Sequence, residues 1–358
     1  MGLLTGGGDC PGLNAVIRAV ARKGERHHGD ELIGFFDAWD GVRERRTMPL
    51  TIEAMRGTLP RGGTVLGTRR GSPFDHEDGV DEVERAMSDL GLDGLIVIGG
   101  NGTLSVSCKL YEEHGIPIVG VPKTIDNDIE GTDVTFGFNT AVQIATDAID
   151  RLHTTAESHN RVILVEVMGR HAGWIATYAG IAGGATSVLI PETYFDIDEL
   201  CARLVRRHDR GRYASIVVVA EGTRPVPGTL ETGGGTLDAG GGTLETGDGI
   251  PGRDRFGHVP LGGIANRIAP AIAERTGFET RVVQLGHVQR GGTPTAYDRV
   301  LATRFGVSAI DAVHAEQWGT MSVLRGEHIV QESLMVAVGK TRTVDMDLFH
   351  GVAEPFFA

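Results

Sequence analysis

Short apolar runs alternate with longer amphipathic stretches along this chain, and this alternation limits the folds that it can adopt. Loop residues and a helical pattern follow each run, for example at 140–152 and 173–182. We interpret four of the runs as buried strands: 95–98, 118–121, 162–165 and 216–219. The pattern is typical of α/β proteins, in which helices flank parallel-rich sheets on both faces. Ligands of such sheets bind beyond the carboxyl ends of the strands, so we expect the chemistry in the loops that follow.

Length and charge narrow the class of protein further. A chain of 358 residues suits one large α/β domain or two lobes. Its formal net charge of −13 disfavours nucleic acid and anionic membrane surfaces as partners. No apolar run approaches the roughly 18 residues needed to span a bilayer, and the first residues lack a signal-peptide pattern. Three widely spaced cysteines without a metal-binding pair indicate reduced thiols, so we expect a cytoplasmic protein.

Two glycine-rich loops follow expected strands. The first loop, 5–14, comes after only four residues, whereas a usual strand has about five or six. We therefore expect either a short strand at the sheet edge or a start further upstream, with a helix opening at Ala15. The second loop, 99–103, follows the run 95–98. Glycines let backbone amides approach an anion, and a helix N-terminus favours negative charge, so two such loops together suit a nucleotide triphosphate. Neither loop fits the dinucleotide-binding or Walker patterns.

A third segment, 122–128, carries two acids at a spacing of two residues. Asp126 and Asp128 come shortly after the expected strand 118–121 and can project toward one cleft. One carboxylate could accept a proton from a substrate hydroxyl while the other holds a metal ion. An isolated pair at this spacing is also found in solvated turns, so the segment needs its neighbours to indicate a site.

Arginines accumulate near the ends of the remaining expected strands. Arg161 and Arg170 flank the run 162–165, and Arg281 and Arg290 flank the run 282–285. The planar guanidinium forms paired, charge-assisted hydrogen bonds with phosphate. A lone arginine is usually a surface charge, but four arginines with glycine and histidine neighbours indicate a phosphate-binding region.

An imperfect repeat of seven residues begins at Gly228 and continues to Asp248. With one leucine in each repeat and a high glycine content, it cannot form a stable coiled coil, and it does not fit the nonapeptide of a calcium-binding β-roll. We expect the insertion 228–248 to be flexible and exposed.

Together these segments resemble the bacterial phosphofructokinase family in order and spacing over nearly the whole chain. The stretches that carry the resemblance are LTGGGDCPGLNAVIR (4–18), GGTVLGTRR (62–70), IGGNGT (98–103), PKTIDNDI (122–129), SHNRVILVEVMGRHAGW (158–174), AEG (220–222) and ETRVVQLGHVQRGGTPTAYDR (279–299). The resemblance implies an enzyme that transfers the terminal phosphate of ATP to the 1-hydroxyl of fructose 6-phosphate in glycolysis, with Mg²⁺ as cofactor.

The resemblance also assigns roles by position. Asp126 would be the catalytic base with Thr124 beside it, and Arg70 and Arg170 would neutralise charge on the transferring group. The expected donor contacts are Gly8, Arg70, Gly102 and Thr103. The expected sugar contacts are Thr124, Asp126, Met168, Gly169, Arg170, Glu221, His287 and Arg290. Arg161 and Arg281 match arginines that family members offer to the sugar phosphate of a neighbouring subunit, which implies a homodimer or homotetramer with shared sites.

Three positions bear on the metal and the donor. Asn101 stands where the family generally has an acidic residue, so Asn101 and Asp128 are the expected Mg²⁺ residues with a reduced ligand charge. Pyrophosphate-using relatives carry aspartate at the position of Gly102, so this glycine favours ATP. Lys123 resembles the lysine of the pyrophosphate users. We give Gly102 more weight, because steric exclusion is harder to overcome than an additional cation.

For the architecture, the resemblance implies two similar lobes with the active site in the cleft between them. Residues 1–137 would form mainly the donor lobe and 138–300 mainly the sugar lobe, with 301–358 returning to the first lobe. Lipid and NAD kinases share a similar glycine loop but lack the segments 122–128 and 168–174. A pyrophosphate-dependent enzyme and a catalytically weakened regulatory homologue remain as alternatives, the latter because of Asn101.

Overall fold

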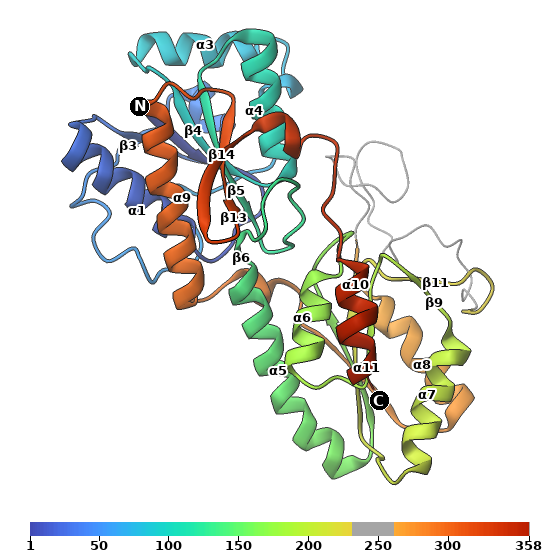
Figure 1. Cartoon of the computed structure of the whole chain (residues 1–358). Coiled ribbons are helices and arrows are strands. Elements are labelled where there is room, and N and C mark those ends of the chain that lie inside the picture. The colour runs from blue at the N-terminus through green and yellow to red at the C-terminus, as the bar shows by residue number, and fades with distance from the viewer. Residues whose placement is uncertain (231–260, 358) are drawn as a thin grey trace. The chain divides into compact units, whose positions relative to one another are not determined.

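The computed structural model describes residues 1–230 and 261–357, which fold into two compact units (Figure 1). Unit 1 comprises Met1–Thr140 and Arg290–Thr341, and unit 2 comprises Ala141–Gln289 and Arg342–Ala358. Residues 138–140, expected in the second lobe, belong to unit 1, and the expected boundaries differ from this division in two further places. Residues 290–300 belong to unit 1, and residues 342–357 belong to unit 2 instead of returning to the first lobe. The second difference arises because the C-terminal residues bury Val344, Phe349 and Phe357 within unit 2.

Unit 1 is built on a mostly parallel sheet with the strand order β14-β13-β5-β4-β1-β2-β3, and β6 pairs with β5. Only the outer pairs, β2–β3 and β13–β14, are antiparallel. The strands are β1 (Gly2–Thr5), β2 (Ile33–Phe35), β3 (Thr47–Pro49), β4 (Leu95–Gly99), β5 (Ile118–Thr124), β6 (Phe136–Gly137), β13 (Thr320–Arg325) and β14 (His328–Ser333). The short β1 lies between β4 and β2, so the expectation of an edge strand is wrong. Its four residues are fully buried, which suits an interior position.

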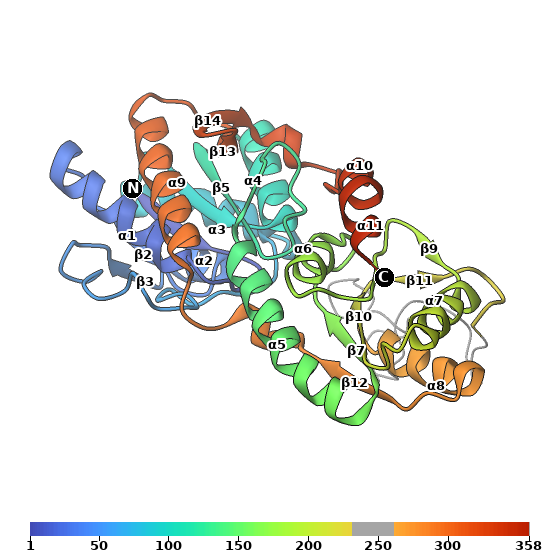
Figure 2. The same ribbon diagram turned by 60° about the horizontal axis from the view of Figure 1, so that its bottom comes forward.

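Helices cover this sheet on both faces. Helix α1 begins at Leu13, two residues before the expected Ala15, and packs along α9 in Figures 1 and 2. Their close approach requires Gly306, since a Cβ there would lie 2.6 Å from the Val16 carbonyl oxygen. The helices and helical turns are α1 (Leu13–Lys23), η1 (Gly24–His28), α2 (Trp39–Glu44), η2 (Pro73–Asp75), α3 (Gly79–Asp89), α4 (Asn101–His114), α9 (Ala296–His314) and η4 (Leu334–Ala337).

Unit 2 contains a smaller parallel sheet with the strand order β12-β7-β10-β8 and a separate pair, β9–β11. Its strands are β7 (Val162–Val167), β8 (Ser187–Leu189), β9 (Tyr194–Phe195), β10 (Ser215–Ala220), β11 (Arg224–Pro225) and β12 (Thr280–Gln284). The helices are α5 (Phe138–His159), which begins in unit 1, α6 (Trp174–Ala182), α7 (Ile197–Asp209), α8 (Ile264–Thr276), η3 (Gly286–Arg290), α10 (Met346–Leu348), η5 (Phe349–Ala353) and α11 (Glu354–Phe356). Helices α7 and α8 pack side by side over a core of aliphatic residues (Figure 2).

The expected fold class is confirmed: β4, β5, β7 and β10 all fall on the predicted apolar runs, and helices follow them. The expected insertion 228–248 lies almost entirely outside the described residues. Across 1–230 and 261–357, no helix combines the length and apolar character that a membrane crossing requires. Cys10, Cys108 and Cys201 are unpaired and buried, and burial raises the pKa of each thiol.

Candidate active site

The two glycine loops of unit 1 meet through one threonine side chain. A Cβ on Gly6 would lie 2.8 Å from Thr103 Cγ2, and a Cβ on Gly99 would lie 2.3 Å from Thr103 Cβ. Glycine is therefore required at both positions so that Thr103 can pack between the ends of β1 and β4. Thr103 lies in the first turn of α4, where the amides have no intrahelical partner and can bind an anion. The structure thus brings two of the expected donor residues, Gly102 and Thr103, next to the first loop.

Three consecutive carbonyl groups of the first loop accept hydrogen bonds from side chains. Thr68 Oγ1 donates to the Gly7 oxygen at 2.7 Å, Lys123 Nζ donates to the Gly8 oxygen, and Arg290 donates to the Asp9 oxygen at 3.1 Å. Holding the carbonyls in this way turns the opposite edge of the backbone toward a ligand. Successive amides presented together form an anion-binding concavity. These three side chains therefore fix the loop in a form whose amides can receive an anion.

Lys123 is buried under this loop, with 3% of its surface exposed. Burial lowers the pKa of its ammonium group, and the neighbouring Arg290 lowers it further, while Cys10 and Asp126 act in the opposite direction. The lysine thus holds the loop through its hydrogen bond to the Gly8 oxygen, a role that the sequence did not reveal.

Arg290 belongs to unit 1, contrary to the expected domain boundary at residue 300. Its guanidinium occupies the space beside Gly8, where an added Cβ would come within 2.6 Å of an Arg290 nitrogen. Arg70 lies next to the same loop, because the Gly7 amide donates a hydrogen bond to the oxygen of the preceding residue, Arg69, at 3.2 Å. The Arg70 side chain is exposed.

The turn after β5 holds the expected base. Asp126 is buried, and its amide donates to Thr124 Oγ1 at 3.0 Å. Asn127 adopts a left-handed backbone conformation with φ of 53°, which asparagine tolerates better than most residues. Its Oδ1 accepts a bond from the Thr135 amide at 3.0 Å, and Thr135 Oγ1 donates to the Thr124 oxygen at 2.8 Å. Sequence reasoning missed both Asn127 and Thr135, although an asparagine between two aspartates is a signal for such a turn.

Asn101 and Asp128 are adjacent, as the metal prediction requires. Asn101 Nδ2 donates to Asp128 Oδ2 at 3.0 Å, while Asn101 Oδ1 is buried and has no hydrogen-bond partner among the described residues. A buried amide oxygen beside a carboxylate supplies the hard oxygen ligands that Mg²⁺ prefers, with waters and phosphate oxygens completing its shell. Within the described parts of the chain, no cluster of three or more His, Cys, Asp or Glu residues forms a protein-only metal site.

In unit 2, the loop after β7 is held by side chains that accept from its amides. The Met168 amide donates to Gln289 Oε1 at 2.9 Å, and the Arg170 amide donates to Glu221 Oε1 at 3.1 Å. Gly169 and Arg170 both have positive φ, 142° and 51°, so the loop is tightly turned. The expected sugar residues Met168, Gly169, Arg170 and Glu221 are thus brought together. Sequence reasoning missed Gln289, which is fully buried in η3 close to the expected His287.

Arg161 and Arg281 lie toward the amino ends of β7 and β12, at the other end of the sheet from Arg170. Both form ion pairs with Glu279, and the Arg161 Nε to Glu279 Oε2 distance is 2.8 Å. The hydrogen bond from Arg161 lowers the pKa of this carboxyl. Within one chain they are therefore separated from the other sugar residues of unit 2, and their use by a neighbouring subunit stays a prediction.

The sequence profile described as phosphofructokinase matches residues 1–313, well over half of the chain. The chain belongs to the phosphofructokinase family. It is accordingly an enzyme of the phosphotransferase class with an alcohol acceptor.

Named relatives of this phosphofructokinase differ in their donor. A pyrophosphate–fructose 6-phosphate 1-phosphotransferase from Streptomyces coelicolor is 53% identical over 98% of both chains. An ATP-dependent 6-phosphofructokinase 3 from the same organism is 52% identical over 96% of both chains. The solved phosphofructokinase of Pichia pastoris in the T-state is 30% identical with a TM-score of 0.77, and the match covers 99% of this chain but 36% of that one. Overall similarity therefore does not separate the two donors.

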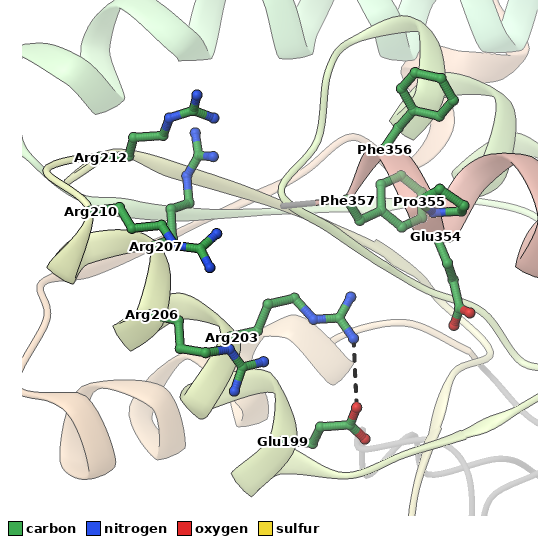
Figure 3. Close-up of a pocket in the computed structure, with 10 residues that line it drawn as sticks. All are labelled: Glu199, Arg203, Arg206, Arg207, Arg210, Arg212, Glu354, Pro355, Phe356 and Phe357. Atoms are coloured by element: carbon green, nitrogen blue, oxygen red, sulfur yellow. Dashed lines mark ion pairs between the residues drawn. The ribbon is translucent and has the colours of Figure 1, made fainter.

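This phosphofructokinase also has an arginine-rich pocket of about 820 Å³ in unit 2 (Figure 3). Five arginines of α7 and the loop after it line the pocket together with residues 354–357. Among the residues drawn, only Arg203 forms an ion pair, with Glu199 at 3.8 Å. Burial and the nearby Arg212 lower the pKa of Arg207. The pocket is lined by Glu199, Arg203, Arg206, Arg207, Arg210, Arg212, Glu354, Pro355, Phe356 and Phe357, none of which is an expected active-site residue.

Proposed function

We propose that this phosphofructokinase transfers the terminal phosphate of ATP to the 1-hydroxyl of fructose 6-phosphate and forms fructose 1,6-bisphosphate. The observation that carries the choice of donor is the space at Gly102. A Cβ built on this residue meets no atom within 4 Å, so the N-terminal turn of α4 leaves room for a nucleotide. Lys123 weighs little against it, because its ammonium group already binds the Gly8 carbonyl oxygen beneath the loop.

Asp126 acts as the general base for the sugar hydroxyl. The turn built by Thr124, Asn127 and Thr135 fixes its backbone, so the carboxylate is positioned before the substrate binds. Mg²⁺, held by Asp128 and by Asn101 Oδ1, would neutralise charge on the donor phosphates. The first glycine loop and Arg70 bind the donor, and the helix N-terminus at Thr103 adds fixed dipoles directed at phosphate.

Unit 2 supplies the sugar-phosphate contacts. Arg170, Glu221 and His287 bind fructose 6-phosphate, with Met168 and Gly169 shaping the loop around it. Arg161 and Arg281 serve the site of a neighbouring subunit in a homodimer or homotetramer, which accounts for their distance from Arg170 along the sheet. The arginines provide the bidentate geometry that phosphate recognition favours.

The test is fructose 1,6-bisphosphate formation with Mg²⁺, run in parallel with ATP and with pyrophosphate. We expect turnover with ATP and little with pyrophosphate. The Gly102→Asp variant should lose ATP turnover, because the carboxylate occupies the nucleotide space and repels its phosphates. The matched Gly102→Ala variant should keep it within about threefold, since a methyl group meets nothing there.

Two outcomes would redirect the proposal. Turnover with pyrophosphate alone would show that the chain uses the same donor as its pyrophosphate-dependent Streptomyces relative, and Lys123 would then be the decisive residue. No turnover with either donor in folded, oligomeric protein would favour the regulatory homologue, and restoring an acid with Asn101→Asp would then show whether the metal site is the cause.

A further inference from the structure

A short C-terminal segment passes directly from unit 1 to unit 2. We call residues 341–344 the strap. Thr341 belongs to unit 1 and forms an isolated antiparallel bridge with Ile129, the residue that follows Asp128. The next residue, Arg342, belongs to unit 2. Thr341, which pairs with the turn 126–129 in unit 1, is therefore joined by a single peptide bond to Arg342 of unit 2.

In unit 2, Trp174 holds the strap by two contacts. Its indole Nε1 donates a hydrogen bond to the Arg342 carbonyl oxygen at 3.2 Å. The Arg342 guanidinium also lies over the indole ring, with its carbon 4.2 Å from the ring centroid, in a cation–π arrangement. Trp174 is 4% exposed and Arg342 is half-buried, so both contacts are partly shielded from water. This tryptophan is the first residue of α6 and comes four residues after Arg170.

Glu192 ties the same two segments together from the other side. Its Oε1 accepts a bond from the Gly173 amide at 2.9 Å and a second from the Val344 amide at 2.9 Å. One carboxylate oxygen thus joins the start of α6 to the strap. Gly173 is needed here, because a Cβ would lie 2.8 Å from Glu192 Oε2 and 2.5 Å from Ile190.

The chain beyond the strap is firmly anchored in unit 2. Phe349, Ala353 and Phe357 are all buried and recur every four residues, and Val344 at the end of the strap is buried as well. The C-terminal helices lie beside α6 in Figures 1 and 2, and η5 packs against it. A displacement of α6 therefore reaches the strap instead of being absorbed by a loose terminus.

We propose that Trp174 and Glu192 are positioning residues that couple sugar binding in unit 2 to the catalytic turn in unit 1 through the strap. The inference rests on the proposed roles of Arg170 and Asp126. A sugar phosphate bound at Arg170 fixes the loop 168–173, and through Trp174 and Glu192 it fixes the strap. Because Thr341 pairs with Ile129, the constraint continues to the turn that carries Asp126 and Asp128. The coupling needs only the covalent bond between Thr341 and Arg342.

The test is calorimetric binding of fructose 6-phosphate with and without Mg²⁺ and a non-hydrolysable donor analogue, either of ATP or, if the donor assay selects it, of pyrophosphate. We expect the analogue to tighten sugar binding in the wild type by about fivefold or more, the lower end of usual coupling factors. In Trp174→Leu and Glu192→Ala this ratio should fall to about one, while the affinity for sugar alone changes less than about threefold. Glu192→Gln keeps an acceptor oxygen and should retain most of the coupling.

Trp318→Leu is the matched control, because Trp318 packs on Gly94 before β4, at the end of the unit 1 sheet away from the loops, and it should leave the ratio unchanged. A wild-type ratio of one, or a ratio that both strap variants retain, would overturn the proposal. So would parallel weakening of both ligands together with lower thermal stability, since that describes a merely structural role. Wild-type protein that neither binds nor turns over fructose 6-phosphate would instead contradict the proposed function itself.

Discussion

The two units hold their proposed ligand-binding loops by opposite kinds of hydrogen bond. In unit 1, the side chains of Thr68, Lys123 and Arg290 donate to three consecutive loop carbonyls. In unit 2, the side chains of Gln289 and Glu221 accept from loop amides. Fixing the carbonyls presents the backbone amides to an anion, whereas fixing the amides leaves recognition to side chains such as the Arg170 guanidinium. Under the proposed function, the donor would be bound mainly by main-chain groups of unit 1 and the sugar mainly by side chains of unit 2.

The largest expected effect is the loss of turnover in Asp126→Asn, a variant of unit 1 that should leave sugar binding in unit 2 intact. Asp126→Asn removes the proposed base but preserves the size of the side chain, so kcat should fall about 10²- to 10⁴-fold while the Kd for fructose 6-phosphate stays nearly constant. Single-turnover kinetics with ATP, together with sugar binding by calorimetry, measures both quantities. Activity within tenfold of the wild type would exclude Asp126 as the base.

Lys123→Met tests the side chains that hold the loop carbonyls in unit 1. Methionine fills a similar volume but cannot donate to Gly8, so a buried charge-assisted bond worth about 1.5–3 kcal/mol is lost. We expect the KM for the donor to rise roughly tenfold or more, with a smaller change for the sugar. Steady-state kinetics with each substrate varied in turn distinguishes the two. A change confined to the sugar would break the proposed division between the units.

Gln289→Leu is the corresponding test of the amide-holding half. The variant leaves the Met168 amide without its acceptor, at a cost of about 1–3 kcal/mol. Here we expect the KM for fructose 6-phosphate to rise and the KM for the donor to remain unchanged. If the donor KM rises as well, the loop 168–173 contributes to binding of both substrates, and the proposed division of donor and sugar binding between the units is wrong.

The smallest expected effect concerns Asp298, which accepts bonds from the Thr140 amide at 2.7 Å and from the Thr140 hydroxyl at 2.6 Å. Burial raises the pKa of this carboxyl above its ordinary value. A raised folded-state pKa stabilises the protein below the unfolded-state pKa of about 3.9, and that contribution is lost as pH rises through the folded-state value. Asp298→Asn should therefore gain stability relative to the wild type from about pH 4 upward. Urea midpoints measured across pH would show the two curves diverging, and parallel curves would contradict the shift.

Much of the fold could be predicted because buried parallel strands leave uninterrupted apolar runs in the sequence. The runs that became β4 and β7 needed no information beyond their composition. The position of β1 could not be predicted in the same way, because burial of four residues on both sides depends on neighbours from distant parts of the chain. The final crossing at Thr341 was missed for a similar reason, since the stripe of Phe349, Ala353 and Phe357 indicates a buried face but not which unit covers it.

The residues of the candidate site likewise fall into a group that the sequence indicates and a group that it does not. Asp126, Arg170 and the glycine loops stand in contiguous motifs, so sequence alone was enough to propose them as site residues. The residues that hold the motifs in place are distant from them in sequence: Arg290 lies 281 positions from Asp9, and Gln289 lies 121 from Met168. Only the folded chain shows these pairs, because a hydrogen bond between single residues leaves no periodic signal.

The three buried cysteines have a practical consequence. Since the thiolate is the reactive form of cysteine, buried thiols with raised pKa values react slowly with maleimide reagents. Cysteines introduced at Val300 in unit 1 and Tyr213 in unit 2, both exposed positions, would then be modified selectively. A donor and an acceptor dye attached there would report inter-unit motion by energy transfer while substrates bind, and the native chain would serve as its own unlabelled blank.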